Sequence, residues 1–189
     1  VVQSGKFDAS IDYWRYKYSN LIVNTQNAQA VLDGTCAGVP NGLPPTASDL
    51  VSRTPNGQPS EIILALQNAN KAITDGVDVA VSYRTETGIG NVGLRAALTY
   101  VNRFSFTTGA TTSDLAGNRN FLSGSFGSLP RWRGNLTGTL ENGDHELFAI
   151  ARYSSAYTND DPVGLVTVPR IKKFVTVDAQ YSYSLEKLI

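Results

Sequence analysis

Apolar and polar residues alternate along both arms of a hairpin that the sequence predicts at residues 68–106. Every second residue is apolar over residues 77–83 and again over residues 92–100, and a short turn at 86–91 separates the two stretches. Strict alternation is typical of a β-strand with one apolar and one polar face. The two alternating stretches have seven and nine residues, whereas strands of soluble proteins usually have about five or six. Length and alternation together predict a hairpin that crosses a membrane.

The same alternation predicts six long strands in an all-β, antiparallel, up-and-down arrangement. They are expected at residues 6–22, 61–85, 91–106, 129–141, 145–157 and 171–185. Aromatic residues crowd between Tyr13 and Tyr18, which fits either the water–lipid boundary of a membrane strand or an aromatic-rich soluble strand. Several strands have fifteen residues or more, while about ten suffice to cross a bilayer. We therefore expect these strands to project beyond the membrane on the side of the long loops.

Two strands leave open which of their residues share a face. In the second strand the apolar positions change from even to odd numbers, which predicts a β-bulge at 68–76. Two sets of residues in the fifth strand could face lipid: Leu147, Ala149, Ala151 and Tyr153, or Phe148 and Ile150. We prefer the first set because the second would carry Glu146 and Arg152 toward lipid, where an arginine at mid-membrane depth costs up to ~2–4 kcal/mol.

The connections between these strands alternate strictly between long and short. In chain order they cover residues 24–60, 86–91, 107–128, 142–144 and 158–170. Up-and-down membrane barrels have this asymmetry, with short periplasmic turns and long extracellular loops, whereas a soluble sandwich has no reason for it. Within the first loop, residues 26–33 could form a short helix. Six strands cannot close a membrane barrel, for which about eight are needed, so we expect the chain to be a segment of a larger barrel.

Composition and charge narrow the class of protein further. The 189 residues include sixteen basic and sixteen acidic side chains, so no polycationic surface indicates nucleic acid. Charged residues make up 17% of the chain, below the roughly 25% of soluble domains, and no apolar run is long enough to predict a transmembrane helix. The single cysteine, Cys36, excludes an internal disulfide and a cysteine-based zinc site. A chain that opens at Val1 without methionine or a signal sequence is expected to be a processed product or a piece of a longer protein.

Candidate catalytic and metal-binding residues are few. His145 is the only histidine, so we predict neither a catalytic triad nor a histidine metal site. Asp160 and Asp161 are too few carboxylates for calcium, which takes about six to eight oxygen ligands. The glycines at 88–90 and 124–127 lack the following helix of a phosphate-binding loop. We therefore predict no enzyme, no cofactor and no metal. Four arginines on the polar faces could line a lumen and contact either protein groups or a ligand: Arg84, Arg95, Arg131 and Arg133.

Short motifs along almost the whole chain resemble the barrel domain of TonB-dependent outer-membrane receptors. The motifs are Asp12-Tyr13-Trp14 followed by Tyr18-Ser19-Asn20-Leu21-Ile22, Asn68-Ala69 leading to Thr74-Asp75-Gly76-Val77-Asp78, and Arg152-Tyr153 followed by Tyr157 and Asp160. Asp78 stands where the family more often has glutamate. The resemblance implies a barrel of about 22 strands. It also implies that residues 1–189 are a partial barrel domain from the C-terminal third, without the plug domain, the TonB box and the final strands.

The resemblance also implies a function. Members of this family are active transporters in the outer membrane of Gram-negative cells, and they take up a scarce solute with energy from the TonB complex. The solute could be siderophore-bound iron or another metal chelate, cobalamin, an oligosaccharide or a peptide, and outer-membrane lipid is a further expected partner. The loop residues expected to contact the ligand are Arg119, Asn120, Tyr157 and Asp160. The alternatives are a soluble β-rich binding or adhesin domain with long loops, and a diffusion porin, which the strand length disfavours.

Overall fold

The fold consists of β-strands joined in chain order. We describe it from a computed structural model, which covers residues 1–23, 28, 31–32, 50–64, 67–108, 110–120, 126–160 and 168–185. Within these residues the strands are β1 (Val2–Ser4), β2 (Phe7–Val23), β3 (Val51–Arg53), β4 (Pro59–Ile62), β5 (Gln67–Thr87), β6 (Gly90–Thr108), β7 (Thr111–Asp114), β8 (Trp132–Asn142), β9 (His145–Ser154), β10 (Tyr157–Thr158), β11 (Arg170–Ile171) and β12 (Phe174–Tyr183). Cys36 and most of the predicted helix at 26–33 lie outside the described residues, and positions 28, 31 and 32 have helical backbone.

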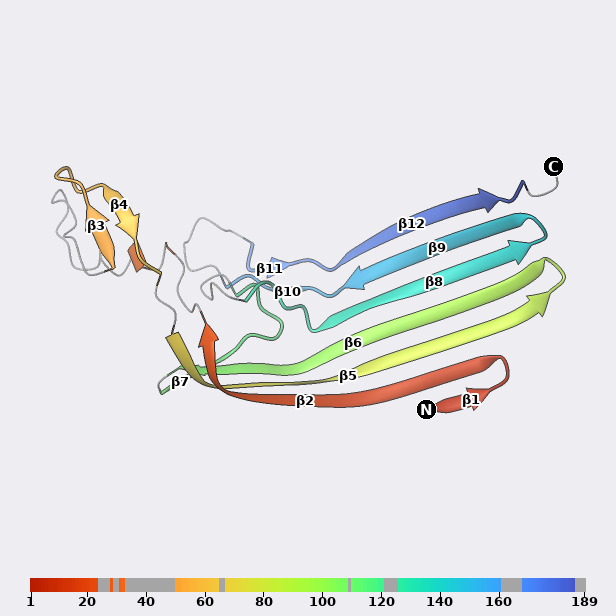
Figure 1. Ribbon diagram of the computed structural model, residues 1–189, viewed down its shortest axis with the longest axis horizontal. Coiled ribbons are helices and arrows are strands. Elements are labelled where there is room, and N and C mark those ends of the chain that lie inside the picture. The colour runs from red at the N-terminus through yellow and green to blue at the C-terminus, as the bar shows by residue number, and fades with distance from the viewer. Residues whose placement is uncertain are drawn as a thin grey trace.

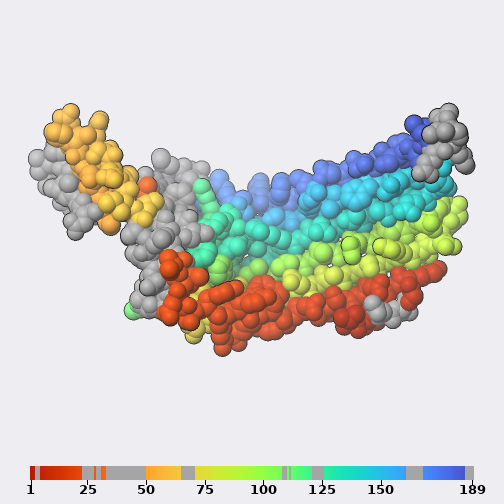
Figure 2. Space-filling view, in the orientation of Figure 1, coloured from red at the N-terminus to blue at the C-terminus, as the bar shows by residue number. Residues whose placement is uncertain are grey.

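One antiparallel sheet contains all the long strands. Its order is β1-β2-β5-β6-β8-β9-β12, and β7 pairs with residues 105–108 at the end of β6. Two small hairpins, β3-β4 and β10-β11, are separate from this sheet. Figure 1 shows a single curved layer with tight turns at one end, the turn end, and long connections at the other, the loop end. In Figure 2 the strands follow one another across the layer in the order of the chain. This is the up-and-down arrangement that the sequence predicts.

The six predicted long strands correspond to β2, β5, β6, β8, β9 and β12. Strands β2, β5 and β6 have 17, 21 and 19 residues, so they extend well past the roughly ten residues that cross a bilayer. The strand predicted at 61–85 is wrong at its start, because residues 59–62 form β4 of a separate hairpin and β5 begins at Gln67. The predicted long loops also contain short strands: β3 in the first, β7 in the second and part of β10 in the third.

A β-bulge lies beside residues 75–76, but its extra residue belongs to the neighbouring strand, so the bulge predicted within the second strand is wrong. The register of β5 with β6 shifts between Asp75 and Gly76, where Asp75 pairs with Arg103 and Gly76 with Val101. Asn102 is therefore the additional residue, and it belongs to β6. The prediction of a bulge within the second strand rested on the parity of Ile62, Leu64 and Leu66. Ile62 belongs to β4, Leu64 lies outside the strands and Leu66 lies outside the described residues, so no phase change within β5 is needed.

The strand register separates an apolar face from a polar face. Val79 of β5 lies between Ile11 and Leu98, and Leu136 of β8 lies between Ala96 and Ala151. The same row continues to Val177 of β12. These pairings place Leu147, Ala149, Ala151 and Tyr153 on the apolar face, as we expected for the fifth strand. Phe148 and Ile150 accordingly lie on the polar face.

The apolar face is open to its surroundings. Ile11, Leu136 and Val177 are 72%, 53% and 67% exposed, although burial of such side chains normally drives folding. The chain exposes 12,880 Å², against about 8,800 Å² for a compact soluble protein of this mass. A single layer has no second layer to cover its apolar face, so this face fits lipid and not the core of a soluble sandwich.

Aromatic residues border the apolar band at both ends. Toward the loop end, Tyr100 and Trp132 stack with ring centroids 4.4 Å apart. Toward the turn end, Tyr181 and Tyr183 of β12 are 61% and 50% exposed. On β12 these tyrosines lie six and eight residues from Val175, about 20–27 Å at ~3.4 Å per residue. That span matches the apolar band of ~25 Å between aromatic girdles in membrane barrels.

Candidate functional site

A buried aspartate fixes the sheet where it leaves the apolar band. Asp75 of β5 lies two residues beyond Val77 toward the loop end, outside the band, and is 1% exposed. Its carboxylate accepts hydrogen bonds from Asn102 Nδ2 at 2.6 Å and from Arg103 Nε and Nη2 at 3.0 and 2.8 Å. The hydrogen bond from Asn102, together with Arg103, holds the pKa of Asp75 below its ordinary value, although burial acts in the opposite direction. The carboxylate therefore binds the extra residue of the bulge and its neighbour.

Gly76 permits a close approach of three strands next to this bulge. A Cβ at Gly76 would lie 2.3 Å from the backbone oxygen of Tyr100 and 2.5 Å from the Trp14 ring. Both distances are far below van der Waals contact, so only glycine fits. The glycine of the Gly-Val-Asp motif that resembles the family is thus explained here by packing between β2, β5 and β6.

Beyond the bulge, the second loop folds back onto the extended part of β6. Strand β7 pairs with residues 105–108 of β6, and Phe126 makes edge contacts with Phe104 and Phe106 at centroid distances of 5.2 and 5.3 Å. Leu115 and Ala72 are buried in the same cluster. This small core lies at the loop end of the sheet and holds the second loop in a defined position.

Asn120, a predicted ligand contact, is 3% exposed and lies inside this loop. Its backbone has a positive φ of 58°. Its side-chain Nδ2 donates to the backbone oxygens of Leu115 at 3.1 Å and Gly127 at 3.0 Å, while its Oδ1 is buried without a hydrogen-bond partner among the described residues. The side chain thus ties together two parts of the loop that carries Arg119.

Arg119 joins the second long loop to the third. Its backbone N–H donates to Thr158 O at 2.9 Å, and Thr158 N–H donates to Gly117 O at 2.8 Å. Its guanidinium Nη1 donates to Asn159 Oδ1 at 3.0 Å. Two loops that are about 40 residues apart in sequence therefore form one surface, which we call the loop assembly (residues 110–120, 126–131 and 155–160).

The loop assembly brings the four predicted ligand-contact residues into one region. Tyr157 is half-buried in β10, where it pairs with Ile171 of β11. Asp160 is exposed and directly follows Asn159, whose N–H donates to Pro169 O at 3.0 Å. The structure thus places Arg119, Tyr157 and Asp160 near one another at the loop end, and Asn120 is buried in the loop that carries Arg119. Nothing in the sequence pattern indicated Asn159 as the residue that connects the loops.

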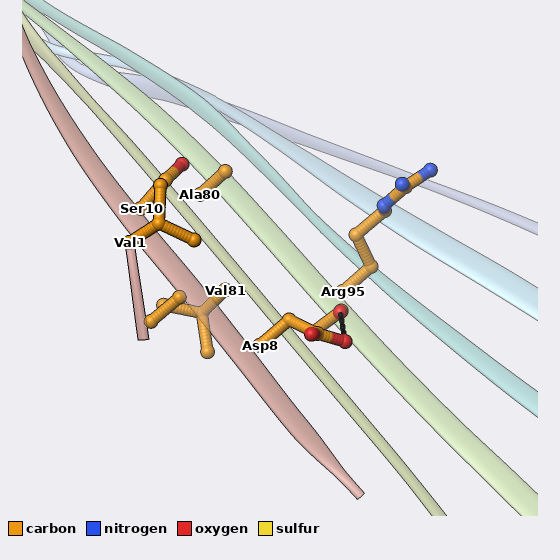
Figure 3. Close-up of a pocket in the computed structure, with 8 residues that line it drawn as sticks. Val1, Asp8, Ser10, Ala80, Val81 and Arg95 are labelled. Atoms are coloured by element: carbon orange, nitrogen blue, oxygen red, sulfur yellow. Dashed lines mark hydrogen bonds between the residues drawn. The ribbon is translucent and has the colours of Figure 1, made fainter. Parts of the chain in front are cut away.

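The polar face of the sheet carries charges of both signs. They are Asp8 and Asp12 of β2, Asp78 and Arg84 of β5, Arg95 of β6, Arg133 of β8, Arg152 of β9 and Asp178 of β12, among others. Figure 3 shows Arg95 extending away from the Asp8 carboxylate, which accepts a hydrogen bond from Ser82 Oγ at 3.4 Å. Asp8, Ser82 and Arg95 line a hollow of about 240 Å³ on this face.

Two of these aspartates face each other directly. Asp12 of β2 is paired in register with Asp78 of β5, and like charges at opposite positions destabilise a sheet. Asp78 Oδ1 is buried and has no hydrogen-bond partner among the described residues. Arg152, by contrast, donates from Nη1 to Asp178 Oδ2 of β12. Asp78 is therefore less well compensated than Asp178.

The fold and the motifs agree with one family of known proteins. The model of the family described as TonB dependent receptor-like, beta-barrel matches residues 1–188. The chain belongs to this family. No curated protein and no solved structure matches it. Because the family consists of outer-membrane transport receptors, the open sheet is part of a receptor β-barrel.

The receptor barrel has functional features that alternation alone did not predict. Asp75 lies two residues from Val77 and so belongs to the row of residues on the apolar face. A charged residue in this apolar row was the signal that could have identified Asp75 from the sequence. For Asn102 no signal was available, because the bulge depends on the pairing of two strands. The part of the receptor that the structure describes holds no group of three or more His, Cys, Asp or Glu side chains placed to bind a metal ion. No helix in that part is long and apolar enough to cross a membrane.

Proposed function

We propose that residues 1–189 form part of the barrel domain of an active outer-membrane transporter, which takes up a scarce solute with energy from the TonB complex. The loop assembly carries this proposal. Hydrogen bonds between the second and third long loops, centred on Arg119, Thr158 and Asn159, give the loop end a built surface of polar and aromatic side chains. Such a preorganised surface is what a receptor needs to capture a dilute ligand, since less conformational entropy is lost on binding.

In this proposal Arg119, Tyr157 and Asp160 contact the ligand, and Asn120 holds the loop from below. A cation, an aromatic ring and a carboxylate in one region suit a polar ligand such as a metal chelate, an oligosaccharide or cobalamin. The polar face of the sheet then lines the lumen, where the charges of Asp12, Asp78, Arg95 and their neighbours meet other parts of the receptor or the passing solute. No residue in this arrangement performs covalent chemistry.

The soluble alternative fits the structure less well. A soluble sandwich needs a second layer over its apolar face, because exposed large apolar patches promote association. The described residues form one layer whose apolar face includes Ile11 at 72% and Val177 at 67% exposure. A passive porin fits less well too, because β5 and β6 extend far beyond the membrane-spanning length and bear a packed loop core.

The experiment is uptake by cells that carry the receptor gene or its deletion, each in the presence and absence of TonB. Radiolabelled ferric chelates, cobalamin and maltodextrins are the probes, and membrane fractionation is done in parallel. We expect the receptor in the outer membrane and uptake of one probe class that is lost in either deletion. Recovery in the soluble fraction, or receptor-dependent uptake that persists without TonB, would overturn the proposal.

A further inference from the structure

A hollow with three cations lies where the apolar face meets the loop assembly. Its volume is about 520 Å³, and its chemically distinctive lining residues are Arg131, Arg170, Lys173, Trp132, Tyr153 and Tyr157. They come from the starts of β8 and β12, the end of β9 and the small hairpin β10-β11. Figure 1 shows these elements meeting at the junction between the sheet and the long connections. We call this hollow the rim pocket.

The rim pocket belongs to the lipid-facing side of the wall. Trp132 pairs with Tyr100, and Tyr153 pairs with Val175, so both rings project from the apolar face. They are 42% and 38% exposed. In the register of β9 with β12, Lys173 directly precedes Phe174, which pairs with Ser154. The pocket thus joins the aromatic border of the apolar band to a group of cations just beyond it.

The charge of the pocket is positive and poorly compensated. No Asp or Glu side chain is among its lining residues. Arg131 is engaged, since its Nη2 lies 3.2 Å from Asp114 Oδ2 and its Nη1 donates to the backbone oxygen of Asn102. For Arg170 and Lys173, both exposed, the described part of the chain provides no ion-pair partner. Arg170 and Lys173 therefore line the pocket without a carboxylate partner among the described residues, whereas Arg131 is held in place by Asp114 and Asn102.

From this arrangement we infer that the rim pocket binds the phosphate group of a lipid headgroup. An arginine and a lysine side by side suit phosphate oxygens, which accept strong charge-assisted hydrogen bonds. Basic pockets at the level of the headgroups are a known means of lipid recognition, and aromatic rings settle at the same depth. The acyl chains of a bound lipid would continue along the apolar face below Trp132 and Tyr153. A free phosphate ion would satisfy the cations but leave this adjoining apolar surface unused.

This inference rests on the proposed location in the outer membrane but not on the identity of the transported solute. The rings of Trp132 and Tyr153 place the rim pocket at the apolar face, whereas the lumen-facing charges lie on the opposite face of the sheet. A bound lipid there would anchor the β10-β11 hairpin, which carries Tyr157 and Arg170. Through Thr158 the same lipid would steady the loop assembly.

The test is native mass spectrometry of the purified receptor in a neutral detergent, titrated with four probes in parallel. The probes are diphosphorylated lipid A, the same lipid after enzymatic dephosphorylation, phosphatidylglycerol and inorganic phosphate. The test variant is the double substitution Arg170→Gln and Lys173→Gln. The matched control is Lys172→Gln, an exposed lysine that removes the same type of charge one position away without lining the pocket.

We expect the wild type and the control to bind the phosphorylated lipids, and the double variant to bind them roughly thirtyfold more weakly, about fivefold for each cation. The dephosphorylated lipid should bind as weakly to the wild type as the phosphorylated lipid binds to the double variant. Equal binding by wild type and double variant would overturn the inference. Binding of inorganic phosphate as tight as that of the lipids would also overturn it in favour of a free-anion site.

Folding and location are checked separately. The folded barrel is verified by its altered migration on unheated gels, and we expect no change in either variant because the substituted side chains are exposed. If the receptor fractionates as a soluble protein, the proposed function fails before the titration begins. If the receptor is in the outer membrane and takes up solute with TonB but the double variant still binds lipid normally, only the lipid site is refuted.

Discussion

Removing the charge of Asp75 should loosen the loop end of the receptor without disturbing the membrane-spanning part. The substitution Asp75→Asn keeps the size of the side chain. It replaces one acceptor oxygen by a donor and so disrupts part of a set of three hydrogen bonds from Asn102 and Arg103. Breaking a buried ion pair typically costs ~3–5 kcal/mol. Because the Arg103 side chain is 41% exposed and can return to water, we reduce the expected cost to ~2–3 kcal/mol.

Hydrogen exchange measured by mass spectrometry reports this cost locally. An opening free energy lower by ~2–3 kcal/mol raises exchange rates about 30- to 150-fold. We expect this increase for amides of residues 71–75 and 103–107, and for those of the second loop that packs on them. Amides of residues 77–83, which lie within the apolar band, should keep their rates. The control variant is Asp8→Asn, which loses only a single hydrogen bond of 3.4 Å and should change neither group.

The pH dependence follows from the direction of the pKa shift. The pKa of Asp75 in the folded receptor is lowered from its ordinary value of 3.8. The ionised Asp75 carboxylate therefore contributes its full stabilisation of the folded state when the pH is above the ordinary pKa. This stabilisation is lost as the pH falls through the lowered pKa of the folded receptor. The difference between wild type and Asp75→Asn should stay constant from about pH 5 to 8. Equal exchange rates in wild type and variant, or increases that are as large at 77–83 as at 71–75, would refute the assigned role of Asp75.

Three further substitutions test the packing, the faces and the loop. Gly76→Ala should sharply lower the yield of folded barrel on unheated gels, because its Cβ would lie 2.3 Å from a backbone oxygen of β6. In the control Gly138→Ala, the nearest atom to the new Cβ is 3.7 Å away, so this variant should fold normally. Equal yields of folded barrel for the two variants would contradict the close approach at Gly76. Leu136→Arg should lower the free energy of folding into lipid vesicles by ~2–4 kcal/mol, whereas Asn135→Arg on the opposite face should change it little. A larger loss of folding free energy for Asn135→Arg would reverse our assignment of the two faces. Asn120→Ala should speed proteolytic cleavage of the second long loop because two hydrogen bonds are lost, and an unchanged cleavage rate would show that they do not hold the loop.

Alternation predicted the strands because the sheet is a single layer with lipid on one side. In β12, for example, Val175, Val177, Ala179 and Tyr181 form an uninterrupted apolar row, and no core packing competes with that pattern. The preference for Leu147 over Phe148 as the lipid-facing residue of β9 followed from the cost of placing Glu146 and Arg152 in lipid. The strand register confirms it.

The loop end could not be predicted in the same way. Ile62, Leu64 and Leu66 alternate like the start of a long strand, yet Ile62 pairs with Val51 of β3 in a separate hairpin. The loop residues Arg119 and Asp160 were chosen for their chemistry, but only the hydrogen bonds between two distant loops show that they share a surface. Local pattern carries no information about contacts between segments 40 residues apart.

The sequence by itself determined the class of this protein, the long strands apart from the start of the second, their apolar face and the division into a turn end and a loop end. These properties depend on a period of two residues and on the lengths of connections, both of which can be read along the chain. The tertiary structure alone decided the bulge at Asn102, the buried carboxylate of Asp75, the loop assembly and the rim pocket. Each of these depends on which strand lies beside which and in what register, and that choice is made by the whole sheet.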